Sequence, residues 1–475
     1  MRDETDSIIK KVSRSASSSN SGPNLSKRFG KGRSGSYFSE YSPEYSGSSS
    51  GSSSPEISTL MPTKKLPPLD YATRVKLCFL TQYSFASSSA SPFYYIQRFY
   101  PHVPEDGHLT AAVVATGFAF YSNLWSDREI CQTARRSYDE ALKLARAALG
   151  SQDIVKRDTT LIAVLLLNTF ERLFSRNTAH EAQREASHLK GAIALVDHRG
   201  EEQFQEGVGM NIFRQLNDYI VLDCLRRTSA VPPKWLTIRK LAEKYIDSND
   251  LGWRFAQAMY EMTALNACLK GKESTVEQLK RAIRLDEEFV DIGQVLANRK
   301  SQMETKFSIV PKAMSRLLDA HAAFNAWKNI RIMRILVHEL ILDLSLGGHE
   351  FPGFDINGQI RDSTKTIQNL SAEIWDYLPQ YVQCISTTLT GDGRSQAFSA
   401  IGFSIQVPDI LFPLYVVHRS SVTADSMRQS ILKQLQTWCQ KSGTYPAHAM
   451  LKAVESHSKN VWEVWWNIGG EAFII

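Results

Sequence analysis

The chain has 475 residues, of which 43% are hydrophobic and 10% aromatic, so it is long enough to bury a large core. Its formal net charge of +6 comes mainly from the first 67 residues, which carry ten Lys/Arg and six Asp/Glu. The remaining chain is close to neutral, and this composition argues against a phosphate-binding surface on the folded part.

The cysteines exclude two common site types. No two of them are close enough in sequence to form a C-x-x-C metal knuckle, and their wide spacing argues against a disulfide framework. Reduced, buried thiols are the simplest interpretation for Cys78, Cys131, Cys224, Cys268, Cys384 and Cys439. The longest apolar run, Leu161 to Leu167, is too short to span a bilayer.

Residues 1–68 form a serine-rich basic segment with few aliphatic side chains. Such a composition cannot offset the entropy cost of folding, so we expect a disordered tail or linker. Residues 30–35 match the letters G-x-G-x-x-G, but no strand precedes them and no helix follows, so a dinucleotide site is not expected. The loose basic cluster at 27–33 is most simply a solvated linker, with a weak nuclear-import or DNA-backbone contact as the alternative.

From residue 69 onward the apolar spacing is helical, and hairpin-bounded strand patterns are nearly absent. The capping box Ser126 to Glu129 opens one expected helix, and a nearly all-apolar helix follows at 159–174. A second capping box, Thr178 to Glu181, opens a helix that ends at Arg199-Gly200. Further helices are expected at about 208–227, 252–269, 274–298, 311–346, 363–390, 396–418, 425–441 and 446–468. We therefore predict an all-α fold, with one large irregular helical domain over 69–475.

Motifs for enzymatic chemistry are incomplete throughout. An H-E-x-x-H pattern begins at His180 but closes on Arg184, and no G-x-S-x-G or phosphate-loop sequence occurs. A helical lyase or synthase would need clustered carboxylates that bind metal ions. The nearest candidates are Asp286-Glu287-Glu288 with Asp291, and this run is equally typical of a solvated helix face. The pair His102 and His108 around Glu105-Asp106 fits no metal-site spacing and indicates a polar loop. We predict no catalytic, cofactor-binding or metal-binding residues in this chain.

Five segments, in order, resemble the regulatory domain of fungal zinc binuclear cluster transcription factors. One runs from His188 to Gly200 and is similar to the helix end H-x-x-G-A-x-x-L-v-x-x-R-G of that family. The others are Tyr138-x-x-Ala141-Leu142 with Asp158 to Glu171, Cys224 to Arg227 with Val231-Pro232-Pro233, Trp327 to Ile335 (with Lys328 in place of the usual Asn), and Leu411 to Tyr415. The resemblance implies the large all-helical middle-homology fold and a role in transcription.

The matched residues are expected to be mainly structural. Gly191 lies within a helix, where glycine costs about 1 kcal/mol relative to alanine, so we expect a close helix–helix approach there. His188 is expected to bond a neighbouring helix, with a pH or ligand sensor as the alternative. Arg199-Gly200 indicates a helix end, with positive φ at the glycine. The structural set is His188, Gly191, Ala192, Leu195, Arg199, Gly200, Trp327, Arg331 and Arg334.

Two groups of residues later in the chain, a pair of arginines and a set of tryptophans, allow more specific expectations. Arg331 and Arg334 share one face of an otherwise apolar helix, so we expect them to pair with carboxylates rather than with DNA. The aromatic end of the chain is expected to pack on the core, with a partner or dimer surface as the alternative for Trp462, Trp465 and Trp466.

The resemblance implies a nuclear transcriptional regulator that is not an enzyme. Its partners would be other transcription proteins or a second copy, with no membrane. The family binds DNA through six cysteines held by zinc, and Arg2-Asp3-Glu4-Thr5 is similar to the sequence that follows this cluster in many members. Two explanations for the missing cluster therefore stay open: the start of the gene model was set at an internal methionine, or the protein is a regulator that lacks the zinc module. Zinc is expected only with that module. Contact with DNA is expected only through it or indirectly. The rival hypotheses are a helical interaction scaffold outside transcription and a helical lyase or synthase.

Overall fold

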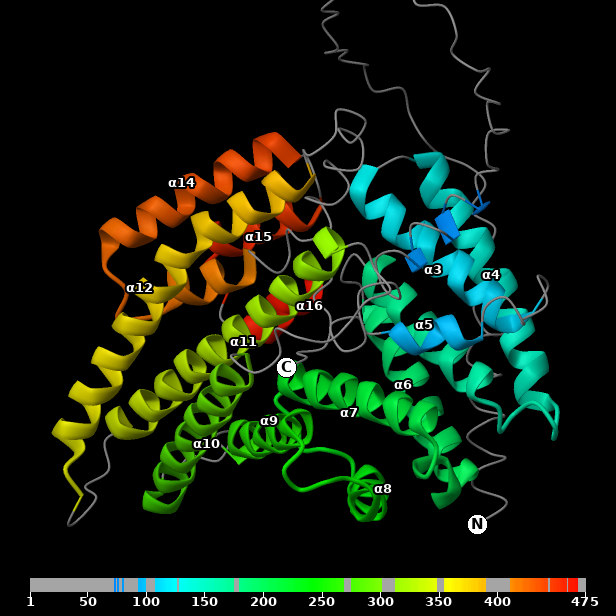
Figure 1. Ribbon diagram of the computed structural model, residues 1–475, viewed down its shortest axis with the longest axis horizontal. Helices are drawn as coiled ribbons and strands as arrows, with labels where there is room; N and C mark the ends of the chain where they lie inside the picture. Colours follow the sequence, from blue (N-terminus) through cyan, green and yellow to red (C-terminus); the bar gives the residue numbers. More distant parts are fainter. Residues whose placement is uncertain are drawn as a thin grey trace, which may run out of the picture.

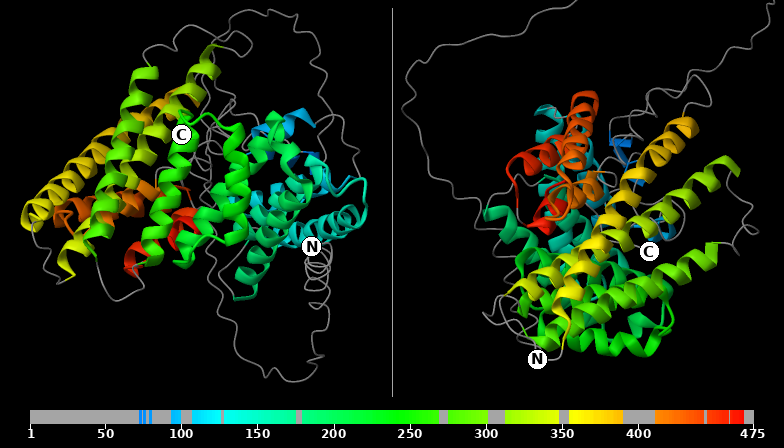
Figure 2. Two further views of the ribbon diagram at one scale, coloured as in Figure 1. Left: turned by 90° about the horizontal axis from the view of Figure 1, so that it is seen from below. Right: turned by 90° about the vertical axis from the view of Figure 1, so that its left-hand side faces the viewer.

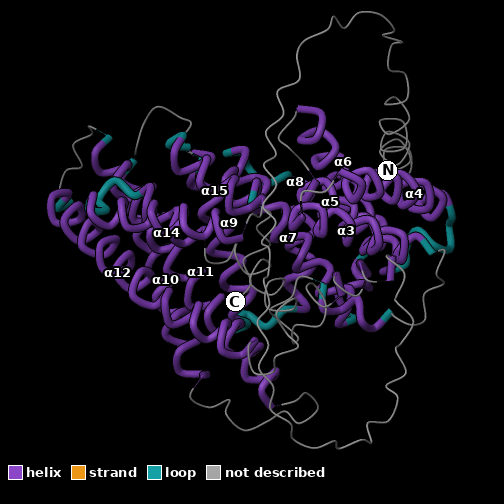
Figure 3. Tube along the Cα trace, turned by 90° about the horizontal axis from the view of Figure 1, so that it is seen from above, coloured by secondary structure: helices purple, strands orange, loops and turns teal. Residues whose placement is uncertain are grey.

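In the computed structural model the chain is helical throughout its described residues, with no strand among them (Figures 1 and 3). The structure describes parts of 72–80, then 93–99, 107–125, 128–174, 179–268, 275–300, 312–347, 354–389, 411–442, 445–458 and 460–468. The expected tail at 1–68 and the expected N-cap residues Ser126 and Thr178 fall outside these ranges. None of the described helices is long and apolar enough to cross a membrane.

The first half of the molecule is built around one buried helix, α5 (Asp158–Phe174), which packs against the helices on either side of it in sequence. Every residue of α5 from Thr160 to Leu173 is buried, as its nearly all-apolar sequence predicted. The surrounding helices are α3 (His108–Trp125), α4 (Arg128–Gly150), α6 (Ala179–Arg199), α7 (Gly207–Arg227) and α8 (Pro233–Ala242).

The second half consists of long helices that pack side by side (Figure 1). The chain passes through α9, α10, α11 and α12 in consecutive antiparallel contacts and then returns toward the first half, ending at α16 (Figure 2). The elements are α9 (Leu251–Cys268), α10 (Val276–Lys300), α11 (Lys312–Leu346), α12 (Ile356–Leu389), α14 (Asp425–Ser442), α15 (Tyr445–Glu455) and α16 (Val461–Asn467), with residues 411–419 also helical.

The buried apolar residues form two clusters, one in each half, and two helices belong to both. Helix α7 contributes Phe213 and Leu216 to the first cluster and Leu222 and Leu225 to the second. Helix α9 does the same, because Trp253 packs into the first cluster while the following turns pack into the second. The two halves are therefore joined by packing as well as by the chain.

Short polar residues fix where several helices begin. At α10 the Thr275 hydroxyl accepts from the Gln278 backbone N–H at 3.2 Å, and the Gln278 side chain accepts from the Thr275 N–H at 2.9 Å. This is a reciprocal capping box, which satisfies two backbone donors that the helix itself cannot. Asp250 Oδ1 accepts from Trp253 N at 2.7 Å at the start of α9.

The helix boundaries correct two of the expectations, and a third lies mostly outside the described residues. The single helix expected at 446–468 is two helices, because His457 has φ of 51° and Asn460 starts α16 by accepting from Trp462 N and Glu463 N. The helix expected from 363 begins at Ile356, seven residues earlier. Of the helix expected at 396–418, only 411–419 lies within the described residues.

Candidate functional site

Three residues from two of the family-like segments meet in one buried polar network between α4, α5 and α6. The Tyr138 hydroxyl donates to Glu171 Oε1 and lies 3.0 Å from His188 Nε2. Glu171 is only 3% exposed. Because the tyrosine proton points to the carboxylate, the bond to His188 requires the tautomer in which Nε2–H donates to the tyrosine oxygen. The expectation that His188 bonds a neighbouring helix is met by this contact.

A second polar pair links the start of α5 to the end of α6. Arg199 Nη2 donates to Asp158 Oδ1, and both side chains are largely buried. The next residue, Gly200, has φ of 79°, which agrees with the expected glycine helix end. Gln203 then donates to the carbonyls of Val196 at 2.7 Å and Gly200. The Arg199-Gly200 pair thus ends α6 and ties it to α5.

The remaining residues of this segment line the core side of α6. Ala192 and Leu195 are buried in the first apolar cluster, while Gly191 is half-buried. The close helix approach expected at Gly191 stays a prediction.

Arg331 and Arg334 both pair with carboxylates, as expected. Arg331 Nε donates to Glu373 Oε2 at 2.7 Å, and its guanidinium lies 4.0 Å from the ring centroid of Trp327. Arg334 makes two bonds to Asp286, from Nε at 2.8 Å and Nη2 at 3.1 Å. These bonds join α11 to α12 and to α10, respectively.

Asp286 is also the end of a buried Asp–His–Ser chain. His338 Nε2 lies 3.1 Å from Asp286 Oδ2, and His338 Nδ1 lies 3.1 Å from the Ser363 hydroxyl on α12. Burial alone would raise the pKa of Asp286, but the bonds from His338 and Arg334 outweigh it and lower the pKa below its usual value. Although hydrolases use these residue types, Ser363 is 0% exposed, so no substrate can reach its hydroxyl.

The acidic run on α10 is largely committed to ion pairs. Arg254 of α9 pairs with Glu288 at 2.8 Å and with Asp291 at 2.7 Å, while Asp286 faces α11. The interpretation as a solvated helix face fits Glu287 and Asp291, which are exposed, whereas Asp286 is largely buried against α11. The carboxylates are not directed toward a common metal-binding point, and within the described ranges no three His, Cys, Asp or Glu side chains gather closely enough to hold a metal ion.

The cysteines are only partly as expected. Among the described residues, Cys131, Cys224, Cys268 and Cys439 are free thiols. Cys224 and Cys439 are buried, and burial raises the pKa of Cys224 to about 11, so this thiol stays protonated. Cys268 is exposed at the end of α9, contrary to the expectation of buried thiols.

The three tryptophans near the end of the chain lie inside the molecule. Trp462, Trp465 and Trp466 are 6%, 3% and 3% exposed, and they belong to the second apolar cluster. In this structure they form no accessible partner surface, which corrects that alternative and agrees with packing onto the core. Their burial follows from the Asn460 cap, which turns the short α16 toward α5 and α7.

Trp466 connects the two halves through two arginines. The guanidinium of Arg172 on α5 lies 4.7 Å from its ring centroid, and that of Arg226 on α7 lies 4.4 Å away. The second ring beside Arg172 is Tyr219 of α7, at 5.1 Å. Asn460 Nδ2 donates to the Arg226 carbonyl at 2.7 Å. We call these five residues the α16 junction.

A buried arginine also joins α7, α8 and α9. Arg239 is 3% exposed, and its guanidinium lies 4.6 Å from the Trp253 ring centroid and 5.1 Å from that of Tyr260. It donates to Asn217 Oδ1 and, at 2.8 Å, to Gln257 Oε1. The sequence analysis missed this residue, because a single arginine in α8 does not indicate which distant rings surround it.

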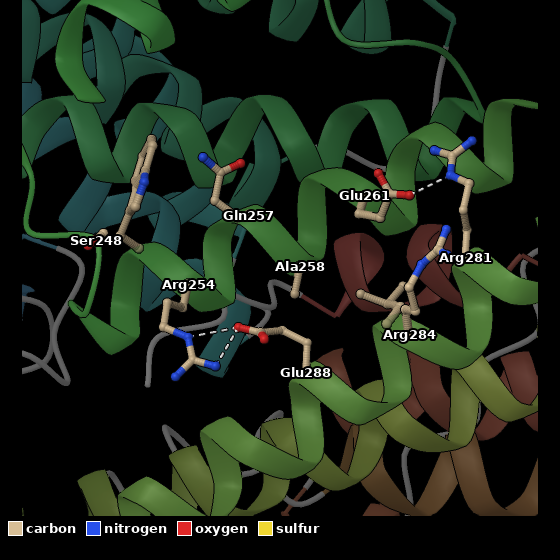
Figure 4. A pocket seen from close by; sticks show the side chains of 10 residues that line it. Ser248, Arg254, Gln257, Ala258, Glu261, Arg281, Arg284 and Glu288 are labelled. Atoms are coloured by element: carbon tan, nitrogen blue, oxygen red, sulfur yellow. Dashed lines mark hydrogen bonds and ion pairs between the residues drawn. The ribbon is translucent and has the colours of Figure 1, made fainter. Parts of the chain in front are cut away.

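A pocket of about 570 Å³ lies between α9 and α10 (Figure 4). Its lining combines charged side chains with Ala258 and Leu285, which are only 4% and 3% exposed. No motif in the sequence indicated it, since the lining comes from two helices whose charges are spread over several turns.

A comparison with known protein families gives a match over part of the chain. Residues 78–250 match the family model described as the fungal specific transcription factor domain. A search of curated proteins and a search of solved structures each found no match. The matched range includes the first three resembling segments, whereas Trp327 to Ile335 and Leu411 to Tyr415 lie beyond it.

Proposed function

We propose that this chain is the regulatory or effector part of a fungal nuclear transcriptional regulator, and that it acts without catalysis. The single observation that carries this proposal is the family match over residues 78–250, which spans α3 to α8. The buried networks add support, because they hold helices together and leave no substrate access to the Asp–His–Ser chain.

We further propose that residues 69–475 work as one regulatory domain. The sharing of α7 and α9 between the two apolar clusters supports this, since each cluster includes residues of helices that also belong to the other. The partners would be other transcription proteins or a second copy of the chain. Contact with DNA would be indirect or through a zinc cluster module, and this chain would hold no zinc.

The test is a tethering experiment in fungal cells. The full chain is fused to an unrelated DNA-binding domain, and a reporter with matching sites is measured. We expect reporter expression several-fold above or below that with the DNA-binding domain alone, and a fluorescent fusion of the chain alone in the nucleus. As a matched control, Leu165→Asp places a charge at a 0% exposed position of α5 and should abolish the effect by unfolding the core. A chain that leaves the reporter unchanged and stays in the cytoplasm would favour the scaffold hypothesis.

Zinc content is tested separately by elemental analysis of the purified chain. We expect well under one zinc per chain, because the six cysteines are too far apart in sequence for a knuckle. Stoichiometric zinc would overturn this part of the proposal.

A further inference from the structure

Helix α5 buries four polar side chains in its second half. Asn168, Thr169, Glu171 and Arg172 are each at most 3% exposed, whereas the preceding run from Leu161 to Leu167 is wholly apolar. Burial takes such groups away from water, and this costs free energy unless another polar or charged group replaces the water. Each of the four side chains therefore needs a partner inside the molecule.

Three of these side chains have identified partners. The Thr169 hydroxyl lies 3.3 Å from the hydroxyl of Tyr219 on α7. Glu171 accepts from Tyr138, and the guanidinium of Arg172 lies against two rings of the α16 junction. These contacts offset part of the cost of burying the three groups.

Asn168 is the exception among the four. Its side chain is 0% exposed, and within the part of the chain that the structure describes neither its Oδ1 nor its Nδ2 has a hydrogen-bond partner. An amide brings two N–H donors and an oxygen acceptor, and buried polar groups in folded proteins are bonded in nearly all cases to the chain or to ordered water. Leucine at this position would continue the apolar run and would favour the helix more strongly than asparagine does. The asparagine thus points to a polar ligand that the chain itself does not supply.

Asn168 shares one face of α5 with Glu171 and Arg172, because residues three and four positions apart are neighbours on a helix. A carboxylate accepts several hydrogen bonds, and a guanidinium carries five N–H donors at its edge, while stacking on a ring involves its face. A ligand beside Asn168 therefore meets an acceptor, a donor and an amide that is both. A net charge on this ligand would be repelled by one of the two ionic side chains, so a small neutral molecule is favoured.

We propose that an internal water molecule is bound at Asn168 and that it also bonds Glu171 and Arg172. Water matches these groups because it donates to carboxylate and amide oxygens and accepts from amide and guanidinium N–H groups. Buried waters typically make about three hydrogen bonds to polar groups that otherwise lack a partner, and such bridges are nearly as favourable as direct bonds. The site lies within the core, since α5 is buried from Thr160 to Leu173.

The bound water connects two networks of the molecule. Glu171 belongs to the network with Tyr138 and His188, while Arg172 contacts Trp466 in the α16 junction. Asn168 is therefore a positioning residue. It holds the water through which the last helix of the chain is connected to the family-like segment of α6.

The test counts internal waters in the purified full chain. Magnetic relaxation dispersion of water oxygen detects waters that stay inside a protein for longer than the protein takes to tumble. We expect Asn168→Ala to hold one long-lived water fewer than the original chain and to melt at a lower temperature, because the bridge loses its amide. If the buried amide had no ligand, alanine would instead raise the melting temperature, since it removes an unpaired polar group and favours the helix.

Leu166→Ala is the matched control, because Leu166 is a 0% exposed apolar residue of the same helix. It should also lower the melting temperature, but its apolar cavity should stay dry and leave the water count unchanged. An unchanged count in Asn168→Ala, or an equal loss of water in Leu166→Ala, would overturn the proposal. Neither result bears on the proposed function in transcription, which the reporter experiment tests.

Discussion

Asp218 is a carboxyl group that titrates near neutral pH. Burial raises its pKa from 3.8 to about 7, against the hydrogen bond from Asn217 and the charges of Arg239 and Arg214. The folded protein therefore keeps this proton over a pH range in which the unfolded chain has lost it. Stability consequently falls as the pH rises from about 4 to 7, and this contribution is constant above that range.

The variant Asp218→Asn should remove this fall, because its amide stays neutral at every pH. At pH 8 we expect the variant to be more stable than the original chain by on the order of 2 kcal/mol, and the gain should shrink toward pH 5. Urea unfolding followed by circular dichroism at the two pH values measures it. As a control, Asp291→Asn changes an exposed carboxylate and should show no such pH-dependent gain. A gain equal at both pH values would contradict the assignment.

Asp286 shows the opposite behaviour, because its partners stabilise the charged form. Replacing this carboxylate with Asp286→Asn removes the negative charge beside Arg334 and His338 and one of the two acceptor oxygens, in a mostly buried site. We expect a loss of about 3 kcal/mol at pH 7, measured by urea unfolding. Since the folded pKa is lowered, the stabilisation is present above about pH 4 and is lost as the pH falls through the folded pKa. The loss in the variant should therefore shrink in acid.

At the residue scale the sequence could predict which side chains need partners but not which partners they find. Two arginines on an apolar face, Arg331 and Arg334, had to pair with acids. One of these acids is Asp286, 48 residues away from Arg334. This pairing depends on how α10 packs against α11, and the spacing of residues along one helix does not determine that packing. For the same reason neither His338 nor Ser363 could be recognised in advance.

At the scale of helices, local signals were enough where apolar spacing was long and regular. Most of the expected helices appear with their ends displaced by only a few residues, and α5 is buried as its composition predicted. The break between α15 and α16 was missed because it depends on the left-handed backbone at His457, which no glycine indicated. Helix α8 was missed because it is short and has little apolar periodicity.

The backbone of α7 lies so close to the preceding turn at Gln203 that adding a single methyl group tests the contact. In the first turn of α7, a Cβ on Gly209 would lie 2.1 Å from the Gln203 carbonyl oxygen, whereas a Cβ on Gly207 would meet nothing within 4 Å. We expect Gly209→Ala to destabilise the protein by about 2 kcal/mol or more, because a backbone atom must shift. Gly207→Ala should be neutral or slightly stabilising. Thermal unfolding of both variants measures the difference, and equal melting temperatures would refute the close approach.

At the scale of the whole molecule, the α16 junction is a second contact between the two halves, in addition to the shared packing of α7 and α9. Trp466 lies against guanidinium groups from α5 and α7, so α16 reaches across from the second apolar cluster to the first. Replacing Trp466 by leucine removes both cation–aromatic contacts, each worth about 1 kcal/mol, together with packing area. We expect faster amide hydrogen exchange in α16 and in the end of α5.

Trp438→Leu is the control for this prediction, because Trp438 lies in α14, within the second cluster. It should lower stability as well but leave exchange at the end of α5 unchanged. Identical exchange maps for the two variants would show that the junction does not couple the halves.

The sharing of α9 also bears on where the chain could be divided and joined to another protein. The family match ends at residue 250, one residue before α9 begins, yet Trp253 of α9 stacks near Phe213 and under Arg239. A recombination point at the end of the match would separate these rings and leave Arg239 without them. A chimera that carries α9 along with α3 to α8 would keep these contacts, so the segment that packs into the first apolar cluster is longer than the segment that the family model matches.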